Sequence, residues 1–288
     1  MKKLQIRIQN AAKAGPVTQI VVERDYVQSY VLHGVSRTPL LRDTLVFKGG
    51  TALKKVHLGD YRFSEDLDFT ALDAPKGAAL ERELQSAIAE AQKAAQQHGA
   101  TVLTIERYEE KEPHPTGQEA FKIRAQLPWQ KKPAVPVFIE VTHDEPVLLP
   151  PIALPVGHGY EEELETTLRC YTLEEIAAEK LRATRQTLAK LEAKGWARSR
   201  ARDFFDLWNL ARLPEGRIAW AKVRDILPQK CTHRNVAIAT LADVFDERLL
   251  AEVRKGWKAS LGPFVPSLPD VEEVLRGTRE ALERLLKQ

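Results

Sequence analysis

The chain has 288 residues, of which 43% are hydrophobic and 29% are charged. This composition is typical of a soluble globular protein, and no stretch approaches the about 20 consecutive apolar residues of a membrane-spanning helix. The length suffices for two domains, and the formal net charge of +3 is too small to indicate a nucleic-acid partner by itself.

The first 15 residues include basic side chains but no long apolar core and no small-residue cleavage pattern. A signal peptide is therefore not expected. The two cysteines, Cys170 and Cys231, lie far apart in the sequence and lack the spacing of metal ligands, so both are expected to be reduced thiols. We expect a cytoplasmic protein with no structural zinc and no membrane contact.

Helical and extended patterns alternate in the first half of the chain. Hydrophobic spacing and composition predict helices at 18–33, 51–58 and 78–98. Extended segments between turn residues predict strands at 45–48, 63–70, 102–108, 120–127 and 135–141. A domain over residues 1–165 with a mixed β-sheet flanked by helices is expected.

The second half of the chain is predicted to be helical. Four prolines in residues 146–155 and an acidic run at 161–165 mark the change in character. Thr172 and Glu175 fit a capping box, which predicts a helix that ends near Gly195. Further helices are expected at 198–213, 218–227, 234–244, 246–256 and 269–286. The expected fold class is α+β, with a C-terminal helical domain over residues 166–288.

The segment at 46–69 carries the clearest chemical pattern. An apolar strand runs into Gly49-Gly50-Thr51, where two glycines bring bare backbone N–H groups against an anion at the start of a helix. Asp66 and Asp68 follow on a second strand, and their alternation places both carboxylates on one face, where they would attract magnesium. A glycine turn beside an acidic strand edge is the simple alternative for either half alone. The combination favours a metal-dependent site that binds a nucleotide phosphate.

Three further residues are unusual for their surroundings. Glu140 interrupts an otherwise apolar strand, so it needs either a cation or a structural ion pair, and it is the candidate third acid. Lys180 lies on an apolar-sided helix, and Asp203 and Asp206 lie one turn apart on another. Positioning of an active-site lysine and plain structural pairing explain these residues equally well.

The stretch from Lys180 to Arg202 contains eight Lys or Arg residues and a single acid, Glu192. This local excess could bind the phosphates of a nucleotide or a polynucleotide. A solvated helix face is an equally good interpretation.

Three segments of the chain resemble the AbiEii-type nucleotidyltransferase toxins, of the DNA polymerase β-like nucleotidyltransferase superfamily. Phe47–Leu53 with Arg62–Phe69 is similar to the family's GG[ST] turn and D-x-D strand. Phe138–Val141 is similar to the strand that carries its third acid, although the family often has a lysine where this chain has Phe138. Leu173–Ala183 with Arg200–Leu207 resembles its helical motif.

The resemblance implies a magnesium-dependent transfer of nucleotides from an NTP to an RNA acceptor, the 3′ end of a tRNA, by a toxin that has a cognate antitoxin and blocks translation. Two Mg²⁺ ions would be held by Asp66, Asp68 and Glu140, which with Lys180 and Asp203 form the expected catalytic set. The expected nucleotide-binding residues are Lys48, Gly49, Gly50, Thr51, Ser64, Lys180 and Arg182. The expected RNA-binding residues are Arg185, Arg198, Arg200 and Arg202.

Two alternatives differ in what the protein acts on. Related chemistry could modify a small molecule or a protein side chain, and an inactive nucleotidyltransferase core could serve only as a binding protein. The basic excess at 180–202 weakly favours RNA, and the presence of all three acids argues against an inactive core.

Overall fold

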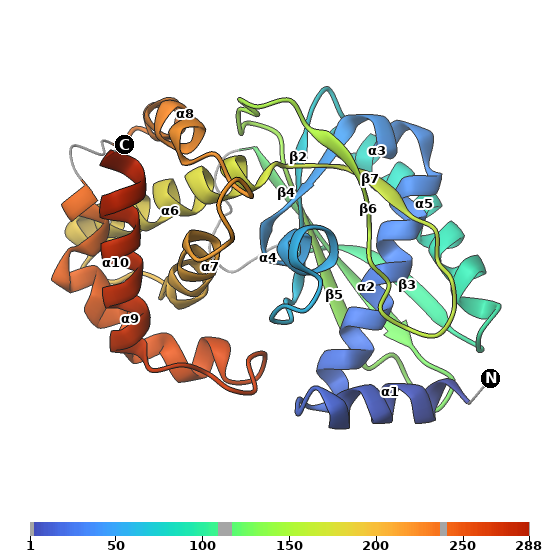
Figure 1. Ribbon diagram of the computed structural model, residues 1–288. Coiled ribbons are helices and arrows are strands. Elements are labelled where there is room, and N and C mark those ends of the chain that lie inside the picture. The colour runs from blue at the N-terminus through green and yellow to red at the C-terminus, as the bar shows by residue number, and fades with distance from the viewer. Residues whose placement is uncertain (1–2, 109–116, 237–240, 288) are drawn as a thin grey trace. The chain divides into compact units, whose positions relative to one another are not determined.

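The computed structural model describes residues 3–108, 117–236 and 241–287 (Figure 1). The chain divides into two compact units: residues 1–145 with 151–171, and residues 146–150 with 172–288. Helices make up 54% and strands 16% of the protein, with a seven-stranded mixed sheet flanked by helices, which confirms the α+β class. The last change between units comes after Tyr171, six residues beyond the boundary predicted after residue 165.

The first unit is built on a sheet with strand order β3-β4-β5-β2-β1-β7-β6. Neighbouring strands are parallel at β2–β5 and β1–β7 and antiparallel elsewhere. The strands are β1 (Leu45–Lys48), β2 (Asp66–Ala71), β3 (Val102–Tyr108), β4 (Gln118–Gln126), β5 (Val135–Thr142), β6 (Ile152–Pro155) and β7 (Thr167–Cys170). The four-residue strands β6 and β7 are not predicted from the sequence, and β2 begins three residues later than predicted.

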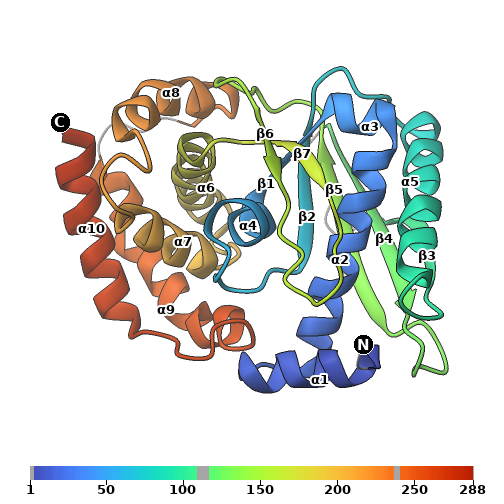
Figure 2. The ribbon, with the colours of Figure 1, turned by 45° about the vertical axis from the view of Figure 1, so that its right-hand side comes forward.

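Helices α2 (Gln19–Arg37) and α5 (Ala78–Gln96) run side by side along one face of the sheet (Figure 2). Their approach is close because a Cβ on Gly34 of α2 would overlap the backbone carbonyl of Ala87 on α5. The unit also contains α1 (Leu4–Ala14) and α3 (Pro39–Thr44), which the sequence analysis did not anticipate. The apolar side chains of the strands pack into the core of this unit, so polar strand residues must occupy the opposite face.

The second unit is helical, as expected. Its α-helices are α6 (Leu173–Lys194), α7 (Ala201–Ala211), α8 (Trp220–His233), α9 (Glu247–Leu261) and α10 (Val271–Lys287). The Thr172 hydroxyl accepts a hydrogen bond from the Glu175 backbone N–H (3.2 Å), and Gly195 ends α6 in the left-handed conformation, so the predicted cap and stop of α6 are confirmed.

Three of the predicted helices differ in the second unit, and one of them, α9, continues to Leu261, beyond the expected end at 256. Helix α8 continues through Pro228 to His233, beyond the expected end at 227. Of the helix expected at 234–244, residues 237–240 lie outside the described part of the chain, and Leu241–Phe245 forms a 3₁₀-helix.

A buried ion pair anchors residues 146–150 to the second unit. The Lys230 ammonium lies 2.8 Å from the Glu175 carboxylate and donates to the carbonyl of Pro146. The same carboxylate accepts the backbone N–H groups of Leu148 and Leu149. Because both charged groups are fully buried, this pairing fixes the segment that follows β5.

Both cysteines are buried free thiols, as expected from the sequence. Burial raises the pKa of Cys170 to about 12 and that of Cys231 to about 11. Neither thiol is therefore activated for chemistry at neutral pH.

Candidate active site

The glycine turn lies directly against the acidic strand. Gly49 has a φ of 78°, and a Cβ at this position would overlap the Asp68 carboxylate. Glycine is therefore required twice over, by the left-handed backbone and by the close approach of Asp68. The turn leads into the short helix α4 (Gly49–Ala52), whereas the sequence analysis began this helix at residue 51.

The helix after the turn does not remain an α-helix. It continues from α4 as a π-helix, η1 (Leu53–Leu58), and ends at Gly59, which has a φ of 70°. Such π-helical turns are rare and occur frequently at functional sites. The single α-helix expected over 51–58 is wrong in this respect.

Strand pairing brings the predicted acids into one row. Lys48 on β1 pairs with Asp68 on β2, and Asp68 pairs with Glu140 on β5. Paired residues on neighbouring strands point to the same face. Leu67 and Ile139, which alternate with these acids, are fully buried in the core, so the row lies on the opposite face.

A second row lies two residues further along the same face. Asp66 on β2 pairs with Phe138 on β5, and Phe138 pairs with Lys122 on β4. The Lys122 ammonium lies 5.5 Å from the centre of the Phe138 ring. The family resemblance led us to expect a lysine at the position of Phe138. Lys122, on the neighbouring strand β4, brings a positive charge close to this position.

The three carboxylates are a suitable donor set for Mg²⁺, which binds oxygen ligands. Gln118 on β4 donates a 2.6 Å hydrogen bond to Oε2 of Glu140 and so orients this acid. Within residues 3–108, 117–236 and 241–287, no group of three or more His, Cys, Asp or Glu side chains is arranged as a ready metal site. The assignment of Asp66, Asp68 and Glu140 as metal ligands stays a prediction.

Arg62 and Ser64 surround the second glycine of the turn. A Cβ built on Gly50 would lie 2.8 Å from a guanidinium nitrogen of Arg62 and 2.9 Å from the hydroxyl of Ser64. Arg62 is buried, and it donates to the carbonyl of Phe63. Ser64 was predicted from the sequence as a nucleotide contact, whereas the guanidinium of Arg62 was not singled out.

The other two polar residues of the turn have contacts within the fold. The Thr51 hydroxyl donates to the carbonyl of Asp66 (2.6 Å) and thereby ties α4 to the start of β2. The Lys48 ammonium lies 5.5 Å from the ring centre of Tyr171, whose hydroxyl hydrogen-bonds to Thr70. Both residues therefore fix the position of the acidic strand beside the glycine turn.

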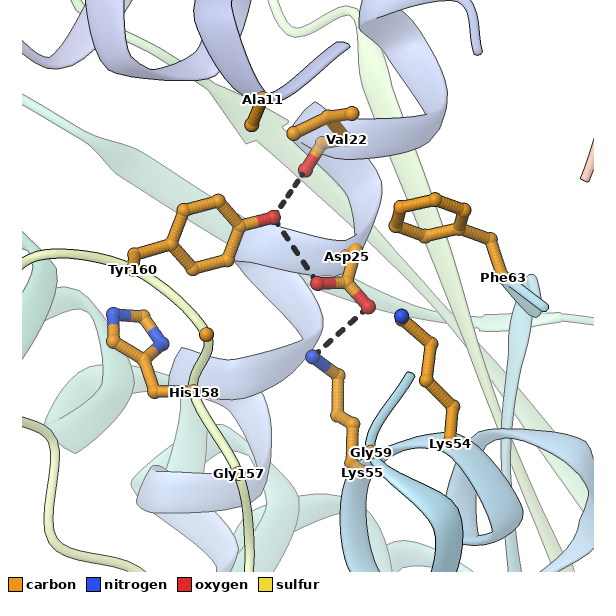
Figure 3. A pocket seen from close by; sticks show the side chains of 11 residues that line it. Ala11, Val22, Asp25, Lys54, Lys55, Gly59, Phe63, Gly157, His158 and Tyr160 are labelled. Carbon is orange, nitrogen blue, oxygen red and sulfur yellow. Dashed lines mark hydrogen bonds and ion pairs between the residues drawn. The ribbon is translucent and has the colours of Figure 1, made fainter. Parts of the chain in front are cut away.

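A cavity of about 260 Å³ lies beside the segment that joins the turn to β2 (Figure 3). At its wall the Lys55 ammonium pairs with Asp25 (3.0 Å), and Tyr160 donates to the same carboxylate. Burial lowers the pKa of Lys55, although the Asp25 charge opposes the shift. The contacts attach η1 to α2, and so hold the end of the glycine-turn helix in place.

In the second unit, Lys180 joins the two predicted acids. Its ammonium lies 2.9 Å from Asp203 and 2.7 Å from Asp206, which is fully buried. Burial alone would raise the pKa of Asp203, but the charges of Lys180 and Arg200 lower it below its usual value. The lysine and the two carboxylates therefore form one charged cluster.

The predicted nucleotide- and RNA-binding arginines have different surroundings. Arg182 is buried and donates to Gln186, and Arg185 lies 4.0 Å from Glu192. Arg200 donates to Thr187, and Arg202 donates to the carbonyl of Ser260. The side chain of Arg198 is exposed. Arg200 and Arg202 thus contribute to the packing of the second unit, and Arg198 is the most accessible of the set.

Membrane insertion receives no support from the helices, because none in the described part of the chain is both long and apolar enough to cross a bilayer.

Comparison with known proteins identifies a family. No curated protein matches the chain. The model of the "Nucleotidyl transferase AbiEii toxin, Type IV TA system" family matches residues 33–286, which include the glycine turn, all three acids and the Lys180 cluster. The chain therefore belongs to the AbiEii family of nucleotidyltransferase toxins of type IV toxin–antitoxin systems.

Proposed function

We propose that this protein transfers a nucleotide from an NTP to an RNA acceptor, the 3′ end of a tRNA, in a magnesium-dependent reaction that releases pyrophosphate and blocks translation. The observation that carries the proposal is the placement of Asp66, Asp68 and Glu140 on one sheet face against the Gly49-Gly50 turn. Family membership supports the reaction class and implies a cognate antitoxin.

The residues of the first unit can be assigned roles in this reaction. Asp66, Asp68 and Glu140 would hold Mg²⁺, which neutralises charge on the phosphoryl oxygens. The acceptor oxygen bonds to the α-phosphorus as the bond to the pyrophosphate oxygen breaks. Glu140, oriented by Gln118, would complete the site nearest the incoming hydroxyl and would either lower the pKa of this hydroxyl or accept its proton.

The glycine turn is the expected site of the departing pyrophosphate. Backbone N–H groups at the start of α4 favour an anion, and Arg62 and Ser64 add donors beside Gly50. The basic stretch at 180–202, with exposed Arg198, supports an RNA acceptor.

Transfer to RNA is tested with labelled NTPs, magnesium and bulk tRNA. We expect the label to enter RNA, and expect EDTA and the Asp68→Ala substitution each to abolish incorporation. The exposed Asp60→Ala is the matched control and should leave incorporation unchanged. Label on protein or on a small molecule would instead identify a different acceptor. No label in any product would contradict the proposal.

Arg62→Ala should weaken NTP binding more than it slows the chemical step. Loss of one charged hydrogen-bond donor to phosphate costs about 1.5–3 kcal/mol, so the KM for NTP should rise about 10- to 100-fold. Initial rates at varied NTP concentration measure the effect. Arg62→Lys keeps the charge and should recover part of the loss, while an unchanged KM in Arg62→Ala would rule out the phosphate contact.

A further inference from the structure

Two aromatic rings and one lysine form a cluster next to the acids, which we call the aromatic platform: Tyr108, Lys122 and Phe138. The ring centres of Tyr108 and Phe138 lie 5.1 Å apart, at an interplanar angle of 61°. The Lys122 ammonium lies 5.5 Å from the Phe138 ring centre and 5.8 Å from that of Tyr108. All three side chains are partly exposed, so the rings remain accessible.

The platform lies on the same sheet face as the acids. Tyr108 pairs with Ala120, which in turn pairs with Glu140, so these three residues continue the row that contains Asp68. Ala120 is small, which leaves space for the tyrosine ring to reach across it toward Phe138. Phe121, the neighbour of both Ala120 and Lys122 in the sequence, is fully buried in the core on the opposite face.

The order of the strands places the platform opposite the phosphate-binding turn. Across the sheet, the turn follows β1, Asp66 and Asp68 lie on β2, and Glu140 lies on β5. Lys122 on β4 and Tyr108 on β3 come beyond Glu140. In an in-line displacement, the attacking oxygen approaches from the side opposite the leaving group. Pyrophosphate at the glycine turn therefore puts the acceptor on the side of the platform.

We propose that the aromatic platform binds the unpaired nucleobase at the end of the RNA acceptor, a subsite that deepens the proposed function and rests on it. Aromatic rings stack on nucleobases of any sequence. The Lys122 ammonium lies over both rings and supplies a positive charge for the phosphate next to the bound base. The acceptor end must be single-stranded, because a paired base cannot leave its own stack without cost.

Binding is measured with the full-length Asp68→Ala protein, in which transfer is blocked, and a single-stranded RNA that carries 2-aminopurine as its 3′-terminal base. Stacking on the platform should quench 2-aminopurine fluorescence. Tyr108→Leu and Phe138→Leu should each remove most of the quenching and weaken binding about 10-fold. Lys122→Met should reduce the slope of the logarithm of the RNA-binding constant against the logarithm of the salt concentration by about 1, the value for one lost phosphate contact.

The matched control is Phe63→Leu, because Phe63 also lies under a lysine, with the Lys54 ammonium 4.2 Å from its ring centre, but it lines the cavity beside α2. This substitution should leave the quenching intact. Equal quenching in Tyr108→Leu, Phe138→Leu and the parent protein would overturn the platform. A duplex RNA in which the 2-aminopurine is paired at a blunt 3′ end is the second test. If this duplex bound as tightly as the single strand, with equal quenching of its fluorescence, the platform would also be overturned.

Kinetics in the active protein separate this inference from the proposed function. The platform substitutions should raise the KM for RNA about 10-fold and leave the KM for NTP unchanged. A rise in the KM for NTP instead would assign the platform to the incoming nucleotide and overturn the proposal. If no RNA is labelled but quenching still depends on Tyr108 and Phe138, the proposed function fails and the nucleobase site stands.

Discussion

Replacement of Gly49 by alanine is expected to reduce nucleotidyl transfer by about 100-fold, because it displaces the carboxylate of Asp68. The new Cβ would occupy the position of the Asp68 carboxylate, so this acid would have to move away from the row that it forms with Lys48 and Glu140. The positive φ of 78° adds about 1–2 kcal/mol of backbone strain. Initial rates of labelled-nucleotide incorporation measure the loss.

Gly59→Ala provides the matched control for this experiment. Gly59 has a similar positive φ of 70°, but a Cβ there meets no heavy atom within 4 Å. Gly59→Ala should therefore cost only the backbone strain, whereas Gly49→Ala adds the displacement of Asp68, and only Gly49→Ala should inactivate the enzyme. Equal activity of the two variants would show that the position of the Asp68 carboxylate is not critical for transfer.

The local pattern in the sequence was enough to find the candidate acids. Alternation along β2 correctly predicted that Leu67 and Phe69 enter the core while Asp66 and Asp68 face the other way. Glu140 was identified for a different reason: it lies between Ile139 and Val141, which are buried, and an acid inside an apolar strand needs a cation or an ion-pair partner. Such predictions succeed because a strand has a period of two and one face of this sheet is apolar.

Strand order could not be predicted in the same way, and it decides which residues join these acids. Gln118 and Lys122 lie on β4, 22 residues before Glu140 and 16 residues before Phe138, and only the antiparallel pairing of β4 with β5 places them beside these residues. Both were missed, although their alternation with buried Phe121 marks them as residues of the polar face. Arg62 was overlooked as a ligand because nothing local shows that its guanidinium turns back onto Gly50.

Backbone irregularities were also beyond the sequence patterns. The π-helix η1 has the same apolar spacing as an α-helix over so short a length, so its wider turns left no signal. Strands β6 and β7 each have four residues, and the prolines before and within β6 pointed to a loop. β7 pairs with β1 and β6 pairs with β7, which are contacts distant in sequence.

Lys180→Met is expected to lower the free energy of unfolding of the second unit by about 3–5 kcal/mol, because it leaves the carboxylate of Asp206 buried without its lysine partner. Chemical denaturation followed by circular dichroism measures the change. The folded state holds the pKa of Asp203 below its usual value of 3.8, so the stabilisation is present above this pH and is lost as the pH falls through the folded pKa. The difference between Lys180→Met and the parent protein should therefore shrink below about pH 4.

The double variant Lys180→Met with Asp206→Leu separates a structural role of the lysine from a catalytic one. Replacing both members of a buried ion pair by apolar side chains is often neutral for stability, so most of the lost free energy should return. If Lys180 only supports the fold, nucleotidyl transfer should return with it. If the lysine also takes part in transfer, as its predicted contact with the triphosphate requires, the double variant should fold normally and remain inactive. A double variant that stays as unstable as Lys180→Met would show that Asp203, which keeps its partner Arg200 at 3.3 Å, is the carboxylate that depends on the lysine.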